Sequence, residues 1–105
     1  MSTRHLTTVA TTTDIEPGEL VGFDVEGTRI AVANAGGRFF AVDDTCTHEA
    51  CSLSEEGTLE GTTVTCGCHG AQFDVTSGAV LAPPALEPLK TYPLQIEQGH
   101  VVVEV

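Results

Sequence analysis

All four cysteines of this chain, and two of its four histidines, fall in two short segments. The segments DDTCTHEAC and VTCGCHGAQFD contain, in order, Cys46, His48, Cys51, Cys66, Cys68 and His69. If Cys46 is taken with His48 and Cys66 with His69, each segment offers one thiolate and one imidazole, and both groups are metal ligands. Since 17 residues separate His48 from Cys66, the four residues could share one centre only if the fold brings the two segments together.

Three interpretations of this four-residue set are open. The residues could be ordinary loop residues, with the cysteines buried as small apolar side chains. They could bind a structural zinc ion, which accepts both Cys and His, although the cysteine knuckles and helical His pairs typical of zinc modules are missing from the sequence. They could instead bind a 2Fe–2S cluster, with two Cys on one iron and two His on the other. The concentration of every cysteine beside two histidines favours a metal centre.

The rest of the chain has the pattern of an all-β protein. No stretch of a dozen residues has a sustained apolar stripe at helical spacing. Glu26-Gly27 and Gln98-Gly99 each separate two strand-like runs, which predicts two hairpins. After Gly36-Gly37, the run RFFAVDD alternates in a way that predicts a strand with one buried face.

The segment between residues 44 and 81 differs from its surroundings. Periodicity weakens and glycines accumulate there, which predicts a loop-rich insert carrying the metal centre on a β scaffold. The chain has 105 residues, the size of one domain. We predict a single domain over residues 1–105, with base sheets in roughly 1–43 and 82–105 and the cluster-binding insert in roughly 44–81.

The charge and hydropathy of the chain exclude some partners. The formal net charge is −11, whereas phosphate contacts need Lys and Arg. From Asp43 through Leu81 the sequence has acidic residues but no Lys or Arg. The N-terminal residues lack the apolar core of a signal peptide, and VVVEV near the C-terminus is too short to cross a bilayer. We expect a cytoplasmic protein with no nucleic-acid or membrane partner.

The two segments resemble the paired motifs of Rieske proteins, C-x-H and C-x-x-H. The resemblance extends over nearly the whole chain, through FFAVDD, QFDVTSGAV and APPALEPLKTYP. The chain is most similar to the small Rieske-type ferredoxins that supply electrons to bacterial aromatic-ring dioxygenases. This resemblance implies a Rieske fold, an antiparallel β-sandwich with a cluster-binding subdomain. It also implies one 2Fe–2S cluster, bound by Cys46, His48, Cys66 and His69.

The mixed ligand set has an electrostatic consequence. Two ferric ions and two sulfides carry a total charge of about +2, so two thiolates bring the oxidised centre to zero, whereas four would bring it to about −2. Adding an electron to a neutral centre is easier than adding one to an anion. Imidazole ligation therefore raises the reduction potential relative to an all-cysteine cluster.

Cys51 and Cys68 remain outside this ligand set. They resemble the extra pair of the high-potential Rieske proteins of cytochrome bc complexes, whose motifs read C-T-H-x-G-C and C-P-C-H-G-S and whose pair forms a disulfide between the cluster loops. The resemblance implies a Cys51–Cys68 bridge; two buried thiols are the alternative in a reducing cytosol. Ala50 and Gly67 depart from that branch, which commonly has Gly and Pro there.

Two further positions resemble the low-potential branch instead. High-potential members have a Ser and a Tyr whose hydroxyls donate hydrogen bonds to cluster or cysteine sulfur. The corresponding residues here are Ala71 and Phe73, whose side chains cannot donate. We therefore predict a potential near the lower end of the Rieske range, around −150 mV rather than +300 mV.

The function implied by the resemblance is that of a monomeric one-electron carrier. It would receive electrons from an NAD(P)H-dependent ferredoxin reductase and pass them to a terminal aromatic-ring-hydroxylating oxygenase. No residue is recognisable as a nucleophile, base or oxyanion donor, so we expect no catalysis by the chain itself. The alternatives are the small Rieske-like subunit of an assimilatory nitrite reductase and a structural zinc module.

The predicted docking surface surrounds the histidine end of the cluster. An acidic rim without cations would orient a basic partner, and an apolar contact could be added beside it. The residues predicted to form this surface are His48, Glu49, Leu53, Glu55, Glu56, His69, Pro83 and Pro84.

Overall fold

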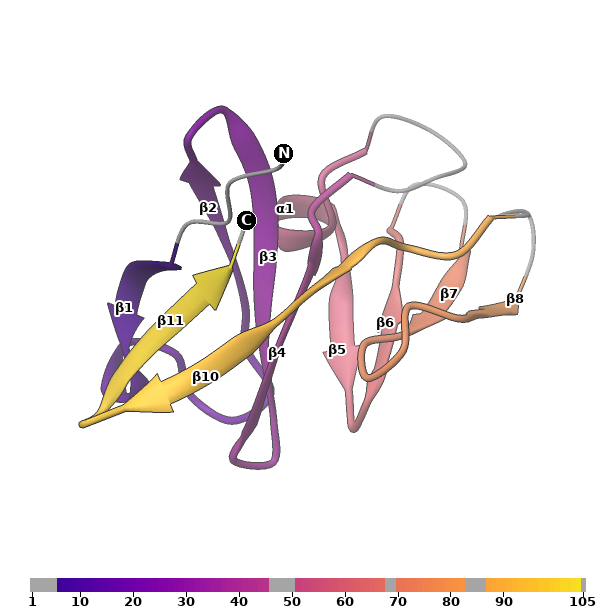
Figure 1. Ribbon diagram of the computed structural model, residues 1–105. Helices are drawn as coiled ribbons and strands as arrows, with labels where there is room; N and C mark the ends of the chain where they lie inside the picture. Colours follow the sequence, from indigo (N-terminus) through magenta and orange to yellow (C-terminus); the bar gives the residue numbers. More distant parts are fainter. Residues whose placement is uncertain (1–5, 46–50, 68–69, 83–86, 105) are drawn as a thin grey trace.

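The computed structural model describes residues 6–45, 51–67, 70–82 and 87–104. Its described strands form three antiparallel sheets (Figure 1). The base consists of two sheets: β1 (Leu6–Thr11), β11 (His100–Glu104) and β10 (Leu94–Glu97) in the first, and β2 (Leu20–Val25), β3 (Thr28–Ala35), β4 (Arg38–Asp43) and β9 (Thr91–Tyr92) in the second. The third sheet contains β5 (Thr58–Glu60), β6 (Thr63–Thr65), β7 (Gln72–Asp74) and β8 (Val80–Ala82). The prediction of an all-β fold is confirmed.

The helical content of the described residues is a 3-10 turn, Thr12–Asp14, and the single-turn helix α1, Leu53–Glu56. No described helix is long and apolar enough to cross a membrane.

Both predicted hairpins are confirmed. Glu26 and Gly27 connect β2 to β3 with φ angles of 50° and 85°, and Gln98 and Gly99 connect β10 to β11 with φ angles of 50° and 79°. Two consecutive residues with positive φ match the right-handed twist of the strands that they join. The turn at Gly36-Gly37 likewise connects β3 to β4.

The prediction that β4 has only one buried face is wrong. Phe39 and Ala41 pack in a core cluster with the β1–β11–β10 sheet, whereas Phe40 and Val42 pack in a second cluster with the β5–β8 sheet. The alternation along β4 therefore separates two cores, and it does not separate a core from solvent.

The insert is loop-rich, as expected, but it also contains a four-stranded sheet that the sequence did not predict. The strands of this sheet are only three residues long. Three residues are too few to show a period of two, which is why the pattern was missed. Val64 and Phe73 from this sheet share one buried cluster with Ala31 and Val42 of the base, so the insert and the base are joined by a common core.

Candidate metal centre

The first motif segment begins where β4 ends. Thr45 and Ser52 form an isolated antiparallel bridge, and the Leu53 amide donates to the Asp44 carbonyl oxygen at 2.6 Å. These contacts close the neck of a loop whose interior, residues 46–50, lies outside the described residues. The loop that contains Cys46, His48 and Glu49 is therefore held at both ends against the base.

The second motif segment connects β6 to β7. The Cys66 amide donates to the Ala71 carbonyl oxygen at 2.7 Å, and the Gly70 amide donates to the Cys66 carbonyl oxygen at 2.9 Å. Gly70 has a φ of 78°, a conformation that favours glycine. Cys66 is 1% exposed, whereas Cys68 and His69 lie outside the described residues. The backbone hydrogen bonds of Cys66 therefore close a tight turn between β6 and β7.

The fold brings the two segments together. Cys51 from the first and Cys66 from the second belong to the same buried cluster, together with Leu53 and Leu89. Cys51 is disulfide-bonded in the structure, and the other half of that bond lies outside the described residues. Segments that are distant in the sequence thus converge beside one core.

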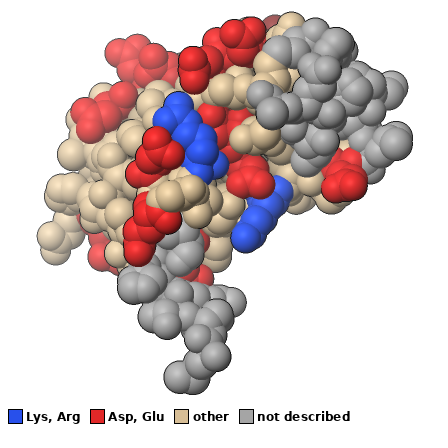
Figure 2. Space-filling view, turned by 90° about the horizontal axis from the view of Figure 1, so that it is seen from above, with Lys and Arg blue, Asp and Glu red and all other residues tan. Residues whose placement is uncertain are grey.

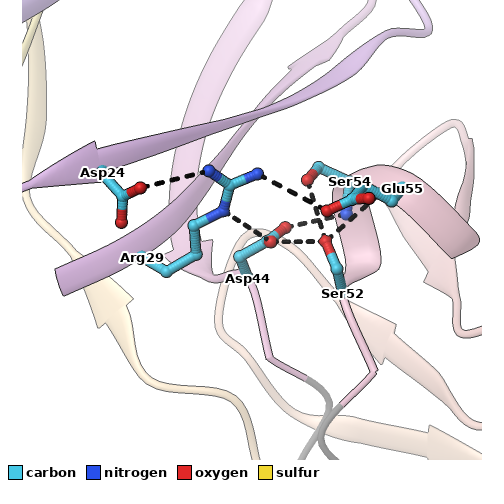
Figure 3. Close-up of polar contacts among 6 residues, drawn as sticks. All are labelled: Asp24, Arg29, Asp44, Ser52, Ser54 and Glu55. Atoms are coloured by element: carbon cyan, nitrogen blue, oxygen red, sulfur yellow. Dashed lines mark hydrogen bonds and ion pairs between the residues drawn. The ribbon is translucent and has the colours of Figure 1, made fainter.

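Below the first loop lies a polar network that the sequence did not reveal. Asp44 is 1% exposed, and its carboxylate accepts hydrogen bonds from Arg29 Nε at 3.1 Å, Ser52 Oγ at 2.6 Å and the Ser54 amide at 2.8 Å (Figure 3). The hydrogen bond from Arg29 to Asp44 raises the pKa of the guanidinium. Arg29 was missed because a single Arg in a strand is usually a solvated residue; its pairing partner is 15 positions away.

The structure corrects two parts of the predicted docking surface. Leu53 is wholly buried, so it is a core residue of α1 and cannot contact a partner. The acidic rim also has a cation, because Arg29 Nη2 lies 3.9 Å from a Glu55 carboxylate oxygen. Red side chains still outnumber blue ones on the face seen in Figure 2. Glu55 and Glu56 are exposed.

Pro83 and Pro84, like His48 and His69, lie outside the described residues. Ala71 and Phe73, the two positions without a hydroxyl, are wholly buried in the hydrophobic core that contains Cys66.

Residues 5–93 match the Rieske [2Fe-2S] domain. The chain belongs to the Rieske family. It is 43% identical over 91 residues to the biphenyl dioxygenase ferredoxin subunit of Pseudomonas sp. (strain KKS102), covering 87% of this chain and 84% of that protein. It is 41% identical over 99 residues to the ferredoxin component of biphenyl 2,3-dioxygenase from Rhodococcus jostii (strain RHA1), covering 94% and 92%.

Solved Rieske structures are also similar. The ferredoxin of Sphingomonas yanoikuyae B1 has a TM-score of 0.89 at 33% identity, covering 96% of this chain and 99% of that one. A chain in the complex of reduced oxygenase and oxidized ferredoxin in carbazole 1,9a-dioxygenase has a TM-score of 0.89 at 35% identity, covering 93% and 91%. The prediction of a Rieske fold is therefore confirmed.

The cofactor of this Rieske chain is one 2Fe–2S cluster, and the observed features fit it. Two thiolates and two imidazoles are the donors that such a cluster needs. Cys66, the described member of the predicted ligand set, is buried just after a strand, in a turn closed by its own amide and carbonyl groups. When bound, the cluster would supply reversible one-electron chemistry, while the backbone contacts of Thr45 with Ser52 and of Cys66 with Ala71 hold the two segments and burial shields Cys66 from water.

Proposed function

We propose that this protein is a one-electron carrier between an NAD(P)H-dependent ferredoxin reductase and a terminal aromatic-ring-hydroxylating oxygenase. The observation that carries the proposal is the extent of the similarities. The chain covers 91–99% of the ferredoxin-sized chains that it resembles, but only 28–29% of the larger oxygenase chains. It thus corresponds to the carrier component. We place it in the cytoplasm as a monomer that catalyses no bond change itself.

Within this function, Cys46 and Cys66 bind one iron, and His48 and His69 bind the other. The support is the spacing of the two motifs and the convergence of their segments beside one hydrophobic core. Replacing each cysteine by serine in turn, and measuring iron and acid-labile sulfide, tests this assignment. Loss of the cluster in Cys51→Ser or Cys68→Ser to the extent seen in Cys46→Ser would contradict it.

We assign Cys68 as the partner of Cys51. The support is that Cys51 is disulfide-bonded and that the matched positions in the two motifs are Cys51 and Cys68. Mass spectrometry after alkylation under native and reducing conditions, followed by peptide mapping, identifies the linked pair. A linkage of Cys51 to any cysteine other than Cys68 would refute the assignment.

Reconstitution tests the carrier function directly. The purified holoprotein is mixed with NADH or NADPH, a ferredoxin reductase and an aromatic-ring-hydroxylating oxygenase, and product is measured with the carrier present and omitted. We expect turnover to depend on the carrier. If elemental analysis finds zinc and the visible spectrum lacks the absorbance of an iron–sulfur cluster, the protein is a zinc module. If the cluster is present but only a nitrite reductase accepts its electrons, the protein belongs with that enzyme. Either result would overturn the proposal.

A further inference from the structure

The two ends of the first cluster loop are joined by hydrogen bonds to one buried carboxylate, that of Asp44. Asp44 lies two positions before the ligand Cys46, and its side chain contacts Ser52 and Ser54 on the far side of the same loop. Consecutive Cα atoms are about 3.8 Å apart, so the Asp44 Cα lies within about 7.6 Å of that of Cys46. One carboxylate therefore joins the two ends of the loop beside its first ligand.

The charge of this carboxylate is balanced from the base sheet. Arg29 Nε donates to Asp44 from the neighbouring strand β3 (Figure 3). The remaining nitrogens of the guanidinium reach Asp24 at 3.6 Å and Glu55 at 3.9 Å. The Asp44 side chain is 1% exposed and that of Arg29 is 39% exposed, so the acidic partner is buried and the basic partner covers it.

The base sheet leaves room for this arrangement. A Cβ atom at Gly22, on β2, would lie 2.4 Å from Ser54 Oγ and 2.6 Å from Arg29 Nη2. Such distances are too short for real contacts, so any larger residue at position 22 displaces the guanidinium and the serine. The absence of a side chain at Gly22 therefore leaves the space that the Arg29 and Ser54 side chains occupy.

We propose that Arg29 and Asp44 form a charge-compensated clamp that positions the first cluster loop and sets the reduction potential of the cluster. Asp44 is a positioning residue, and Arg29 cancels the effect that its buried negative charge would otherwise have on an incoming electron. The inference rests on the proposed ligand set. Its test uses the isolated holoprotein, so it does not depend on which reductase or oxygenase the carrier serves.

The clamp predicts shifts of opposite sign. Arg29→Met leaves the Asp44 charge uncompensated, which disfavours the reduced cluster. At an effective dielectric constant of 20, one charge about 12 Å away changes a one-electron equilibrium by about tenfold, or ~59 mV. We expect Arg29→Met to lower the equilibrium constant for reduction by about this factor, and Asp44→Asn to raise it by about as much. The double variant Arg29→Met/Asp44→Asn should return to within threefold of the wild type.

Redox titration of the purified holoproteins at one pH and ionic strength measures these shifts. Arg38→Met is the matched control, because it removes the same charge from the far end of β4, about 17 Å along the strand from Asp43. It should shift the equilibrium constant by less than threefold. Shifts of the same sign in Arg29→Met and Asp44→Asn would indicate general loosening. Equal shifts in Arg29→Met and Arg38→Met would indicate net charge alone. Either outcome overturns the proposal.

Gly22→Ala tests the positioning role while keeping every charge. It should accelerate cluster loss, measured as the decay of visible absorbance with a chelator present, by several-fold. Gly18→Ala is its control: the space around Gly18 is open but its φ of 88° strains an alanine, so this variant measures the effect of a strained backbone away from the clamp. Ser52→Ala removes one arm of the clamp without crowding and should also accelerate cluster loss, which keeps the test decisive if Gly22→Ala does not fold. Cluster loss at the control rate in Ser52→Ala would refute the positioning role.

Discussion

At the scale of single residues, the predicted low reduction potential depends on two hydrogen-bond donors that this chain lacks. Ala71 and Phe73 are both wholly buried, beside Cys66. Neither side chain can donate a hydrogen bond, and both are shielded from bulk solvent. Fewer donors leave the reduced, more negative centre less stabilised. The low potential predicted from the sequence therefore also has a basis in burial.

Restoring the donors should raise the potential. In the double variant Ala71→Ser/Phe73→Tyr, each new hydroxyl stabilises the reduced centre, and each ~59 mV gained is a tenfold change in a one-electron equilibrium. Redox titration of the wild type and the variant measures the difference. Ala79→Ser, an exposed position in the same insert, adds a hydroxyl away from the core and should leave the potential unchanged. A wild-type potential above about +100 mV would contradict the argument.

Tyr92 offers a second prediction, because it is the only tyrosine of the chain. Burial, and then the 2.6 Å hydrogen bond that its hydroxyl donates to Asp43, raise the pKa of Tyr92 above the ordinary value. The unfolded chain ionises first, near pH 10. The stability contributed by the protonated hydroxyl is thus complete below pH ~10 and is lost as the pH rises toward the higher folded pKa.

The tyrosinate absorbance measures this directly. The native protein should titrate above pH 10 and the denatured chain near it. Tyr92→Phe should abolish the signal and reduce the free energy of unfolding by about 1 kcal/mol at neutral pH. Asp43→Asn keeps an acceptor but removes the charge, so its Tyr92 should titrate below the wild-type value. Native titration at the denatured midpoint would show that the hydrogen bond is absent in solution.

At the scale of elements, the sequence was informative where a local signal was sufficient. Glu26-Gly27 and Gln98-Gly99 identified two hairpins because turn chemistry is local. The proposed ligand pairs rest on an equally local signal, the spacing of the two motifs, and they stay a prediction. The Arg29–Asp44 pair, the burial of Leu53 and the sheet of the insert were not predictable in this way. Each depends on contacts between segments far apart in the chain, and three-residue strands carry too little periodicity.

The contact between α1 and the second cluster loop explains a departure from the high-potential motif. A Cβ atom at Gly67, where that branch commonly has proline, would lie 1.9 Å from the Glu56 carbonyl oxygen. The atoms that it would meet belong to the Glu56 backbone, which cannot move aside cheaply. Glycine at this position lets the end of α1 lie directly against the loop that carries Cys66.

Gly67→Ala should therefore separate α1 from this loop. We expect a loss of at least about 2 kcal/mol in the free energy of unfolding, from overpacking, together with faster cluster loss. Gly61→Ala is the control: its φ of 60° lies in the left-handed region but the space around it is open, so it should cost about 1 kcal/mol of backbone strain and leave the cluster in place. Equal effects of the two substitutions on cluster retention would contradict the close approach.

At the scale of the whole molecule, a net charge of −11 affects every encounter. A carrier must bind two partners in turn and release each, so its interfaces are expected to be small and weak. Long-range attraction between the acidic carrier and a basic partner surface then increases the encounter rate more than the affinity. The acidic side chains do not act alike, however. Glu55 lies beside Arg29, so its charge is partly balanced, whereas Glu56 is exposed and its carbonyl oxygen lies against Gly67 in the second cluster loop.

This difference allows local and global charge effects to be separated. Glu56→Lys and Glu97→Lys, the latter on β10 in the base, each change the net charge from −11 to −9 (−11 + 2). We expect electron transfer to the oxygenase, followed by stopped-flow absorbance, to slow as salt rises, because the Debye length falls from about 10 Å at 0.1 M to about 3 Å at 1 M. If partners dock beside the cluster, Glu56→Lys should reduce the low-salt rate several-fold more than Glu97→Lys, and the two should converge at 1 M salt. Equal slowing would mean that net charge alone attracts the partner, and rates insensitive to salt in both variants would favour an apolar interface.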